Sequence, residues 1–294
     1  MGQKDISEKI FEDYDDVFSD IFNGIVYDGE QVIKPDELSN ALVHSQYKDE
    51  KGILHEEERD VAKYWEKNKV RLAVYGIENQ SRIDRNLPLR IIGYDGASYK
   101  DMYIRAEKEK IRPVPAITLV LYFGNERWNR NRKLSDIITV PSGLDAYFND
   151  YKINVVEVAW LEEEVIKRFR SDFKLLAEFF VNRRKNPNYR PDGVETIKHV
   201  DAMLKLMTVM TGDERYREIT KQGDFEEVHT MCEVAERLEK TGEARGIIIG
   251  EARGEEKVSK LYRILIKEGK ISELEKAAQD SEYRKNLYVL YGIE

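Results

Sequence analysis

The sequence predicts an α/β fold in which a β-sheet is flanked by helices and followed by a helical C-terminal extension. Apolar residues recur at helical spacing in residues 6–24 and 162–184. Residues 117–123 and 153–161 are runs of β-branched and apolar residues, which is typical of strands covered on both faces. Beyond residue 187 the pattern is again almost entirely helical. Strands between helices, then helices alone, indicate this class of fold.

The N-terminal part predicts a helix and then a β-hairpin. The helix covers residues 6–24, with Gly24 as its C-cap. Residues 56–65 lead through a turn at residues 67–69 into the apolar run that begins at residue 70, which favours an antiparallel hairpin. The segment DVAKYW, residues 60–65, is equally compatible with a short helix, so both alternatives stay open.

In the middle of the chain, the sequence pattern predicts a crossover helix and, after a further helix, the end of the first domain. Residues 89–110 have apolar positions three or four apart, although their glycines weaken the helical pattern. The helix of residues 162–184 ends before the proline-rich segment KNPNYRPDG. We therefore expect a domain over residues 1–186 and a helical C-terminal region over residues 187–294.

The C-terminal region contains one internal repeat, GEARGIII followed by GEARGEEK, at residues 242–257. Its glycines are four residues apart and would form one line along a helix, where each costs up to about 1 kcal/mol relative to alanine. Close approach of a second helix, most simply in a homodimer, would offset this cost. A flexible charged linker is the alternative. The tail resembles a module for oligomerisation or partner binding.

Composition excludes several classes of protein. The single cysteine, Cys232, cannot form an internal disulfide, and the four histidines lack the spacing of zinc ligands. No apolar run approaches about 18 residues, and the N-terminus lacks the apolar core of a secretion signal. We therefore expect a cytoplasmic protein without a membrane partner.

Two basic segments stand out against a formal net charge of −8. The acidic total argues mildly against nucleic acid, because phosphate binding depends on Lys and Arg. Residues 125–133 and 183–190 are nonetheless basic and contain aromatic residues, which favours DNA as a partner. Solvated loop charges are the alternative. The candidate DNA-binding residues are Arg127, Arg130, Arg132, Lys133, Arg183, Arg184 and Lys185.

Two carboxylates are expected to meet at the hairpin. Asp60 lies near the start of the first arm and Glu78 near the end of the second, and antiparallel pairing brings these positions together. Paired carboxylates repel each other and therefore need a cation between them. Mg²⁺ suits this position, because proteins usually bind it through only one or two carboxylates. A metal ion of this kind lowers the pKa of a bound water and stabilises the charge on a phosphorus under attack, so the predicted reaction is phosphodiester hydrolysis. Gln80 shares the face of Glu78 and could orient water or phosphate. A solvated hairpin end is the alternative.

Four segments in order, RDVAKYW, RLAVYGIENQSRIDRNLPLRIIGYDGASYK, PAITLVLYFGNERW and YKINVVEVAWL, make the chain resemble a known family. This is the Rpn family of recombination-promoting nucleases and putative transposases, within the PD-(D/E)xK nuclease superfamily. The resemblance covers roughly residues 10–184. It implies a restriction-endonuclease-like mixed sheet flanked by helices and metal-dependent cleavage of DNA, with Mg²⁺ or Mn²⁺ as the cofactor.

The resemblance also implies roles for particular residues. Asp60 and Glu78 correspond to the catalytic acids, and Gln80 stands where the wider superfamily has lysine. Asp60, Glu78 and Asn79 are the expected metal ligands. An amide cannot replace the charge of a lysine, so a catalytically weak or inactive DNA-binding protein of the same fold is the alternative to an endonuclease. A third hypothesis is that the protein is a helical interaction protein. The acid that the first helix contributes in such enzymes is expected to be Asp15, Asp16 or Asp20.

Overall fold

The chain folds into two compact units, Met1–Val234 and Ala235–Glu294. The computed structural model describes residues 10–41, 43–48, 54–109, 112–221 and 228–293. The first unit extends beyond the domain end expected at residue 186. It also contains α5 (Val200–Thr211) and α6 (Arg215–Lys221), and α5 contacts the short N-terminal helix η1 (Phe11–Asp13).

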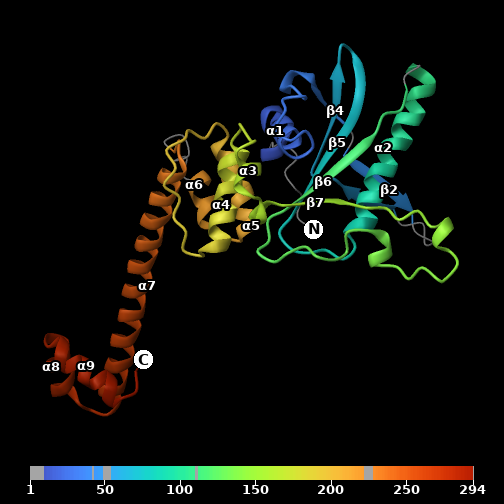
Figure 1. Cartoon of the computed structure of the whole chain (residues 1–294). Helices are drawn as coiled ribbons and strands as arrows, with labels where there is room; N and C mark the ends of the chain where they lie inside the picture. Colours follow the sequence, from blue (N-terminus) through green and yellow to red (C-terminus); the bar gives the residue numbers. More distant parts are fainter. Residues whose placement is uncertain (1–9, 42, 49–53, 110–111, 222–227, 294) are drawn as a thin grey trace. The chain divides into compact units, whose positions relative to one another are not determined.

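A five-stranded mixed sheet forms the centre of the first unit, in the order β1-β4-β5-β6-β7 (Figure 1). Its strands are β1 (Leu38–Asn40), β4 (Val61–Lys67), β5 (Val70–Gln80), β6 (Ala116–Tyr122) and β7 (Asn154–Glu157). β4 runs antiparallel to β1 and β5, whereas β5, β6 and β7 run parallel. A separate antiparallel pair consists of β2 (His44–Lys48) and β3 (Leu54–Glu58). The predicted α/β class with a mixed sheet is confirmed.

The hairpin of β4 and β5 resolves the ambiguity of residues 60–65 in favour of a strand. The two turn residues, Asn68 and Lys69, have φ values of 52° and 64°. Positive φ at both positions is what a two-residue type I′ turn requires, and this turn matches the twist of the strands. Val61 pairs with Ile77. The register therefore places Asp60 level with Glu78, as the sequence predicted.

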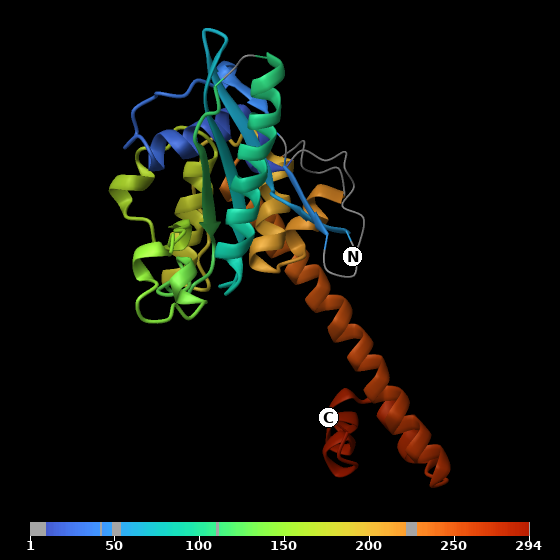
Figure 2. The same ribbon diagram turned by 90° about the vertical axis from the view of Figure 1, so that its right-hand side faces the viewer.

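Helices cover both faces of the sheet (Figures 1 and 2). On one face, α2 (Leu87–Glu109) packs Ile91 and Tyr94 into a core with Val120 and Trp128. On the other face lie α1 (Asp15–Ile25) and α4 (Phe173–Lys185). There the rings of Phe22 and Tyr75 have centroids 4.3 Å apart, and those of Phe123 and Phe180 are 4.9 Å apart. The glycines of residues 89–110 do not interrupt α2.

A buried ion pair connects α2 to the sheet. Arg59 Nη2 donates to Asp95 Oδ1 at 3.1 Å, and the side chains are 1% and 6% exposed. Thr118 Oγ1 donates to the same oxygen at 2.7 Å, and the Tyr151 hydroxyl donates to Asp95 Oδ2. A Cβ atom at Gly76 would lie 2.3 Å from Arg59 Nη1, so this strand position requires glycine. Burial lowers the pKa of the guanidinium, and the Asp95 carboxylate opposes that shift.

Two predicted helices are interrupted. In the range 6–24, residues 1–9 lie outside the described part, and η1 is separated from α1 by Tyr14, which has extended backbone angles. Gly24 lies inside α1 and not at its C-cap. A Cβ atom there would lie 2.3 Å from the ring of Phe169, so close packing explains this glycine.

The helix predicted over residues 162–184 is divided into α3 (Glu163–Ile166) and α4. Between them, the backbone N–H groups of Arg170 and Ser171 donate to Asp20 Oδ2 at 2.8 and 2.7 Å. A carboxylate on α1 therefore replaces the carbonyl acceptors that a continuous helix would supply. Short 3-10 turns complete the first unit: η2 (Pro35–Glu37), η3 (Leu134–Asp136), η4 (Asp145–Tyr147) and η5 (Val158–Trp160).

The second unit is helical. It comprises most of α7 (Met231–Lys267), then α8 (Ile271–Gln279) and α9 (Ser281–Leu290). Leu261, Leu265, Ala277 and Leu287 form its buried core. The glycine repeat lies within α7, so this segment is helical and is not a flexible linker.

A search of the described residues finds no helix with the length and apolar character needed to cross a membrane.

Candidate active site

Asp60 and Glu78 lie together at the end of β5 from which the chain leaves towards α2. Asp60 Oδ2 accepts a hydrogen bond from the backbone N–H of Asn79 at 2.8 Å. Glu78 is only 2% exposed. Strand register brings the two carboxylates together although they are 18 residues apart in the sequence. The predicted pair is therefore a feature of the folded chain.

Glu78 faces α2 and is held by two side chains. Arg90 Nη2 forms an ion pair with Glu78 Oε1, and Gln80 Nε2 donates to the same oxygen at 3.2 Å. Glu78 Oε2 is buried and has no hydrogen-bond partner among the described residues. Burial, together with the charge of Asp60, raises the pKa of Glu78 to about 7, and Arg90 opposes this shift. Gln80 thus lies on the same face as Glu78, as predicted.

Glu12 is a further carboxylate at this end of the sheet, and the sequence did not identify it. Its side chain is fully buried, and neither carboxylate oxygen makes a hydrogen bond of normal geometry among the described residues. Burial raises the pKa of Glu12 to about 8, and the nearby charge of Asp60 adds to this shift. Asp60 therefore influences two buried glutamates, Glu78 and Glu12.

The break at Tyr14 explains why Glu12 was missed. In one continuous helix over residues 6–24, Glu12 would lie about 200° around the axis from both Ile10 and Tyr14, away from the apolar face. The 3-10 turn of η1 and the extended Tyr14 instead turn Glu12 inward beside the buried Phe11. The available signal was weak, because Glu12 lies between Phe11 and Asp13 in a segment rich in acidic residues.

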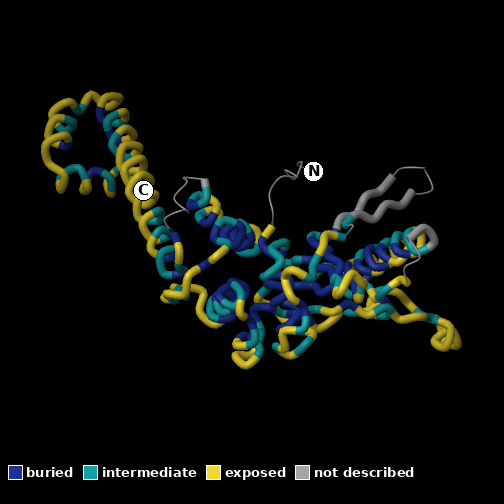
Figure 3. Tube along the Cα trace, turned by 90° about the horizontal axis from the view of Figure 1, so that it is seen from above, coloured by how far each residue is buried: buried dark blue, intermediate teal, exposed yellow. Residues whose placement is uncertain are grey.

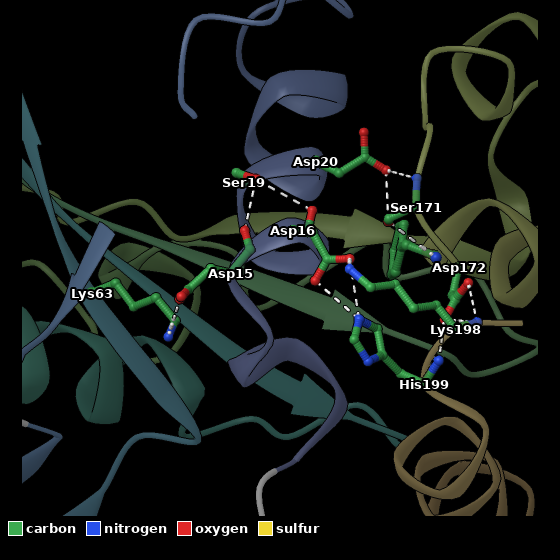
Figure 4. A network of polar contacts seen from close by, with 10 residues as sticks. Asp15, Asp16, Ser19, Asp20, Lys63, Ser171, Asp172, Lys198 and His199 are labelled. Carbon is green, nitrogen blue, oxygen red and sulfur yellow. Dashed lines mark hydrogen bonds and ion pairs between the residues drawn. The ribbon is translucent and has the colours of Figure 1, made fainter. Parts of the chain in front are cut away.

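The three acids expected from the first helix serve as links between elements (Figure 4). Asp15 pairs with Lys63 of β4 at 2.8 Å. Asp16 Oδ2 accepts from Lys198 Nζ at 2.7 Å, and its Oδ1 lies 3.0 Å from His199 Nε2. Asp20 accepts from the segment before α4, as described above. These contacts fasten α1 to β4 and to the segments that precede α5 and α4, whereas Glu12 is the acid of this region whose pKa responds to Asp60.

The donor atoms at this site suit a hard divalent cation. Four buried oxygens, Glu12 Oε1 and Oε2, Glu78 Oε2 and Asn79 Oδ1, make no hydrogen bond of normal geometry within the described residues. Looser hydrogen bonding from the backbone and from Asn79 lowers the pKa of Glu12 but does not offset the effect of burial. Buried acceptors without partners are costly, and a cation would relieve both this cost and the repulsion of the carboxylates. In the described part of the chain, no three His, Cys, Asp or Glu side chains already form a metal-binding group. Mg²⁺, which is commonly held by only one or two carboxylates together with water, fits this partial set.

The two basic segments meet at Trp160 of η5. The guanidinium carbons of Arg127 and Arg184 lie 4.9 and 3.7 Å from the centroid of its ring system. These arginines are 57 residues apart in the sequence, so folding brings the two predicted patches together. Arg184 also donates to the Ala159 carbonyl at 2.7 Å.

Several of the predicted DNA-binding side chains have acidic or aromatic neighbours. Arg127 and Arg132 both pair with Glu157, and Lys133 pairs with Asp150. Arg183 lies over the ring of Phe179. Arg130 and Lys185 are exposed. The structure therefore places Arg132 and Lys133 in local ion pairs, and the roles of all seven residues in DNA binding stay predictions.

The fold and the site define an α/β protein with buried carboxylates at the end of a mixed sheet and a basic, aromatic surface. The family described as "Putative transposase, YhgA-like" matches residues 67–211 of the chain. The match includes Glu78, Asn79 and Gln80 and begins after Asp60. The resemblance predicted from the sequence is confirmed. No curated protein and no solved structure matches the chain.

The raised pKa of Glu12 predicts a pH-dependent stability. Folded Glu12 keeps its proton up to about pH 8, whereas its ordinary pKa is 4.5. Between these values the folded state binds more protons than the unfolded state, so the free energy of unfolding falls as pH rises. We expect Glu12→Gln to remove up to about 1.4 kcal/mol per pH unit from this slope. Urea unfolding in the presence of EDTA, at pH values from 5 to 8, measures this dependence of the free energy of unfolding on pH.

Glu30→Gln is the matched control, because Glu30 is exposed. This variant should keep the slope of the parent protein. If Glu12→Gln also kept the parent slope, Glu12 would not be the buried titrating group that we describe.

Proposed function

We propose that the protein is a metal-dependent DNA endonuclease that hydrolyses phosphodiester bonds, in recombination of mobile elements or in defence against foreign DNA. The observation that carries the proposal is the meeting of Asp60 and Glu78, beside buried oxygens without partners, at the end of β5. The match to the YhgA-like family over residues 67–211 supports DNA as the substrate.

Asp60 and Glu78 would hold Mg²⁺, with Asn79 as the further expected ligand. A divalent cation bound there lowers the pKa of a water molecule and stabilises charge on a phosphate under attack. Asp60 is oriented for this role by the Asn79 N–H. The side-chain amide of Gln80 donates a hydrogen bond to Glu78. Because the amide carries no charge, it orients the carboxylate but cannot neutralise it.

Arg90 supplies the positive charge that Gln80 lacks. Its side chain is 30% exposed, and its guanidinium contacts Glu78, Asp84 and Tyr94. A permanently charged side chain at this position can stabilise an anionic phosphate, because Arg remains protonated at every relevant pH. Arg90 is therefore the residue that we assign to charge stabilisation in this chain.

DNA would approach over the basic, aromatic surface around Trp160. Arg130 and Lys185 are exposed and available to phosphate oxygens, while Arg127 and Arg184 lie over the indole. Contacts of this kind position a nucleic acid without reading its sequence. We therefore expect that these residues give DNA cleavage no strong sequence preference.

The direct test of the proposal is cleavage of supercoiled plasmid by the purified full chain. We expect nicked and linear products with Mg²⁺ or Mn²⁺ and intact plasmid with EDTA. An identically purified Asp60→Asn variant controls for contaminating nucleases. Intact plasmid with every metal, from protein that is folded, would contradict the proposal.

A second candidate function is DNA binding without cleavage. The observation that favours it is the closed environment of Glu78, in which Arg90 and Gln80 engage the same carboxylate oxygen while Gln80 leaves the lysine position uncharged. In this case the plasmid stays intact but the protein binds it with a strong salt dependence. The cleavage and binding assays together separate the two functions.

Binding of DNA is expected to depend on Arg130 and Lys185. Each phosphate contact that is lost reduces the steepness of the plot of log affinity against log salt concentration by about 0.9 for duplex DNA. Arg130→Ala and Lys185→Ala should each produce this change and should weaken binding to all sequences alike. Fluorescence anisotropy with a labelled duplex between 50 and 200 mM salt measures the slopes.

Arg112→Ala removes an exposed arginine outside the surface around Trp160 and is the matched control. Its slope should equal that of the parent protein. An unchanged slope for both Arg130→Ala and Lys185→Ala would exclude this surface as the DNA contact.

A further inference from the structure

The middle of α7 presents an unusual helical surface. Every residue from 243 to 256 is exposed (Figure 3). Among them are three consecutive isoleucines, Ile247, Ile248 and Ile249, which are 62%, 64% and 52% exposed. A Cβ atom at Gly246, Gly250 or Gly254 would meet no described atom within 4 Å. Within the described structure, this stretch of α7 has an unpartnered apolar face.

A helix of this composition is costly without a partner. Each interior glycine destabilises a helix by about 1 kcal/mol relative to alanine, and helices without tertiary contacts are marginal in water. At 100° per residue, the glycines form one side of α7, and Ile247 and Ile249 flank that side. Glycines permit two backbones to approach closely, and the flanking isoleucines would then lose contact with water. This surface is suited to another helix.

The sequence of this segment is self-complementary about Ile248. Positions that are equally distant from Ile248 carry the same small or apolar residue, or a pair of opposite charges. The pairs are Ile247 with Ile249, Gly246 with Gly250, Arg245 with Glu251, Ala244 with Ala252, Glu243 with Arg253, and Gly242 with Gly254. Every residue of the 13-residue segment from Gly242 to Gly254 obeys this relation.

We propose that α7 pairs with α7 of a second copy of this chain in an antiparallel, two-fold arrangement centred on Ile248. In this arrangement, glycine lies level with glycine, and each Glu lies level with an Arg of the second copy. Parallel pairing in register would place Glu243 level with Glu243 and Arg245 level with Arg245, which is unfavourable. A parallel shift of eight residues aligns the glycines again but also aligns Glu with Glu. Charge complementarity therefore selects the antiparallel dimer.

The mass of the full chain in solution is the first test. Sedimentation velocity should show a dimer of the 34.5 kDa chain, with a monomer population that grows on dilution. Gly246→Leu/Gly250→Leu should shift this equilibrium to the monomer, because the added side chains separate the backbones. A chain that is monomeric at all accessible concentrations, or a dimer that this variant leaves unchanged, would overturn the proposal.

The orientation of the helices is tested by pulsed electron paramagnetic resonance of spin-labelled protein. The native thiol is removed by Cys232→Ser, and single labels are placed by Ile248→Cys or Glu255→Cys, both on the side of α7 away from the glycines. At 1.5 Å per residue, antiparallel pairing separates the two labels at position 255 along the helix axis by about 21 Å more than those at 248. Equal distances at both positions would indicate parallel pairing and overturn the proposal.

Charge exchange tests the pairing of Glu243 with Arg253. Either Glu243→Arg or Arg253→Glu alone creates like charges at two symmetric levels and should weaken the dimer by about tenfold. The double variant restores opposite charges and should recover the parent affinity. In parallel register, neither single variant creates a new like-charge level, so affinities that do not change in this series would contradict the antiparallel model.

Discussion

Asp60→Asn is expected to reduce the rate of plasmid cleavage by about a thousandfold. Losses of this size are typical when one charged or hydrogen-bonding group of a preorganised active site is removed. The substitution keeps the size of the side chain, and the amide oxygen can still accept the hydrogen bond that Asp60 Oδ2 accepts from the Asn79 N–H. It removes the negative charge that would bind the cation and that raises the pKa of both Glu78 and Glu12. The initial rate of nicking with Mg²⁺ measures the effect.

Two further measurements distinguish a lost metal site from a lost fold. The thermal midpoint and DNA affinity of Asp60→Asn should stay close to those of the parent, because Asp60 lies at the end of a strand and outside the basic surface. Binding of Mn²⁺, followed by calorimetry without DNA, should weaken. Asp145→Asn alters an exposed aspartate of η4 and is the control, with parent cleavage rates and metal affinity. Parent-like cleavage by Asp60→Asn would refute the site.

Asp95→Ala is expected to destabilise the first unit by about 3–5 kcal/mol, because it leaves the charge of Arg59 buried without its partner. Arg59 is 1% exposed, and Asp95 also accepts hydrogen bonds from Thr118 and Tyr151. Removal of this one carboxylate therefore uncouples α2 from β6 and from the segment that precedes β4. Chemical unfolding monitored by tryptophan fluorescence measures the change, since Trp128 packs in the core beside α2.

The double variant Arg59→Met/Asp95→Ala should recover part of the lost stability, since no unpaired charge remains. Asp101→Ala is the matched control on the same helix. It removes a partly exposed carboxylate that pairs with Arg105 four residues away and accepts a hydrogen bond from the Tyr64 hydroxyl at 3.3 Å. These two contacts together contribute less than about 2 kcal/mol. Equal losses for Asp95→Ala and Asp101→Ala would mean that the buried pair has no special role.

The site and the self-complementary helix are independent features. The candidate site lies in the first unit, whereas the segment centred on Ile248 lies in the second. A variant that disrupts the dimer without changing cleavage would show that each copy contains a complete site. Loss of cleavage on dilution would instead indicate that two copies act together on the two strands of DNA.

The sequence by itself determined the α/β class, the main helices and strands, and the hairpin that contains Asp60 and Glu78. These features depend on local signals: period-two and period-3.6 apolar patterns, and a two-residue turn. A β-bulge between Trp65 and Glu66, which only the structure shows, shifts the register by one residue and so brings Asp60 level with Glu78. The family match over residues 67–211 likewise depends on the sequence alone. The self-complementarity of residues 242–254 can also be read directly from the chain.

Tertiary structure alone decided which charged residues act together. Glu12 turns inward only because the chain breaks at Tyr14. Asp15, Asp16 and Asp20 become links because β4 and the segments before α5 and α4 lie beside α1. Arg59 and Asp95 meet across 36 residues because α2 returns over the sheet. The physical reason is that burial and the approach of distant elements set the energy of a charge, and local sequence patterns record neither.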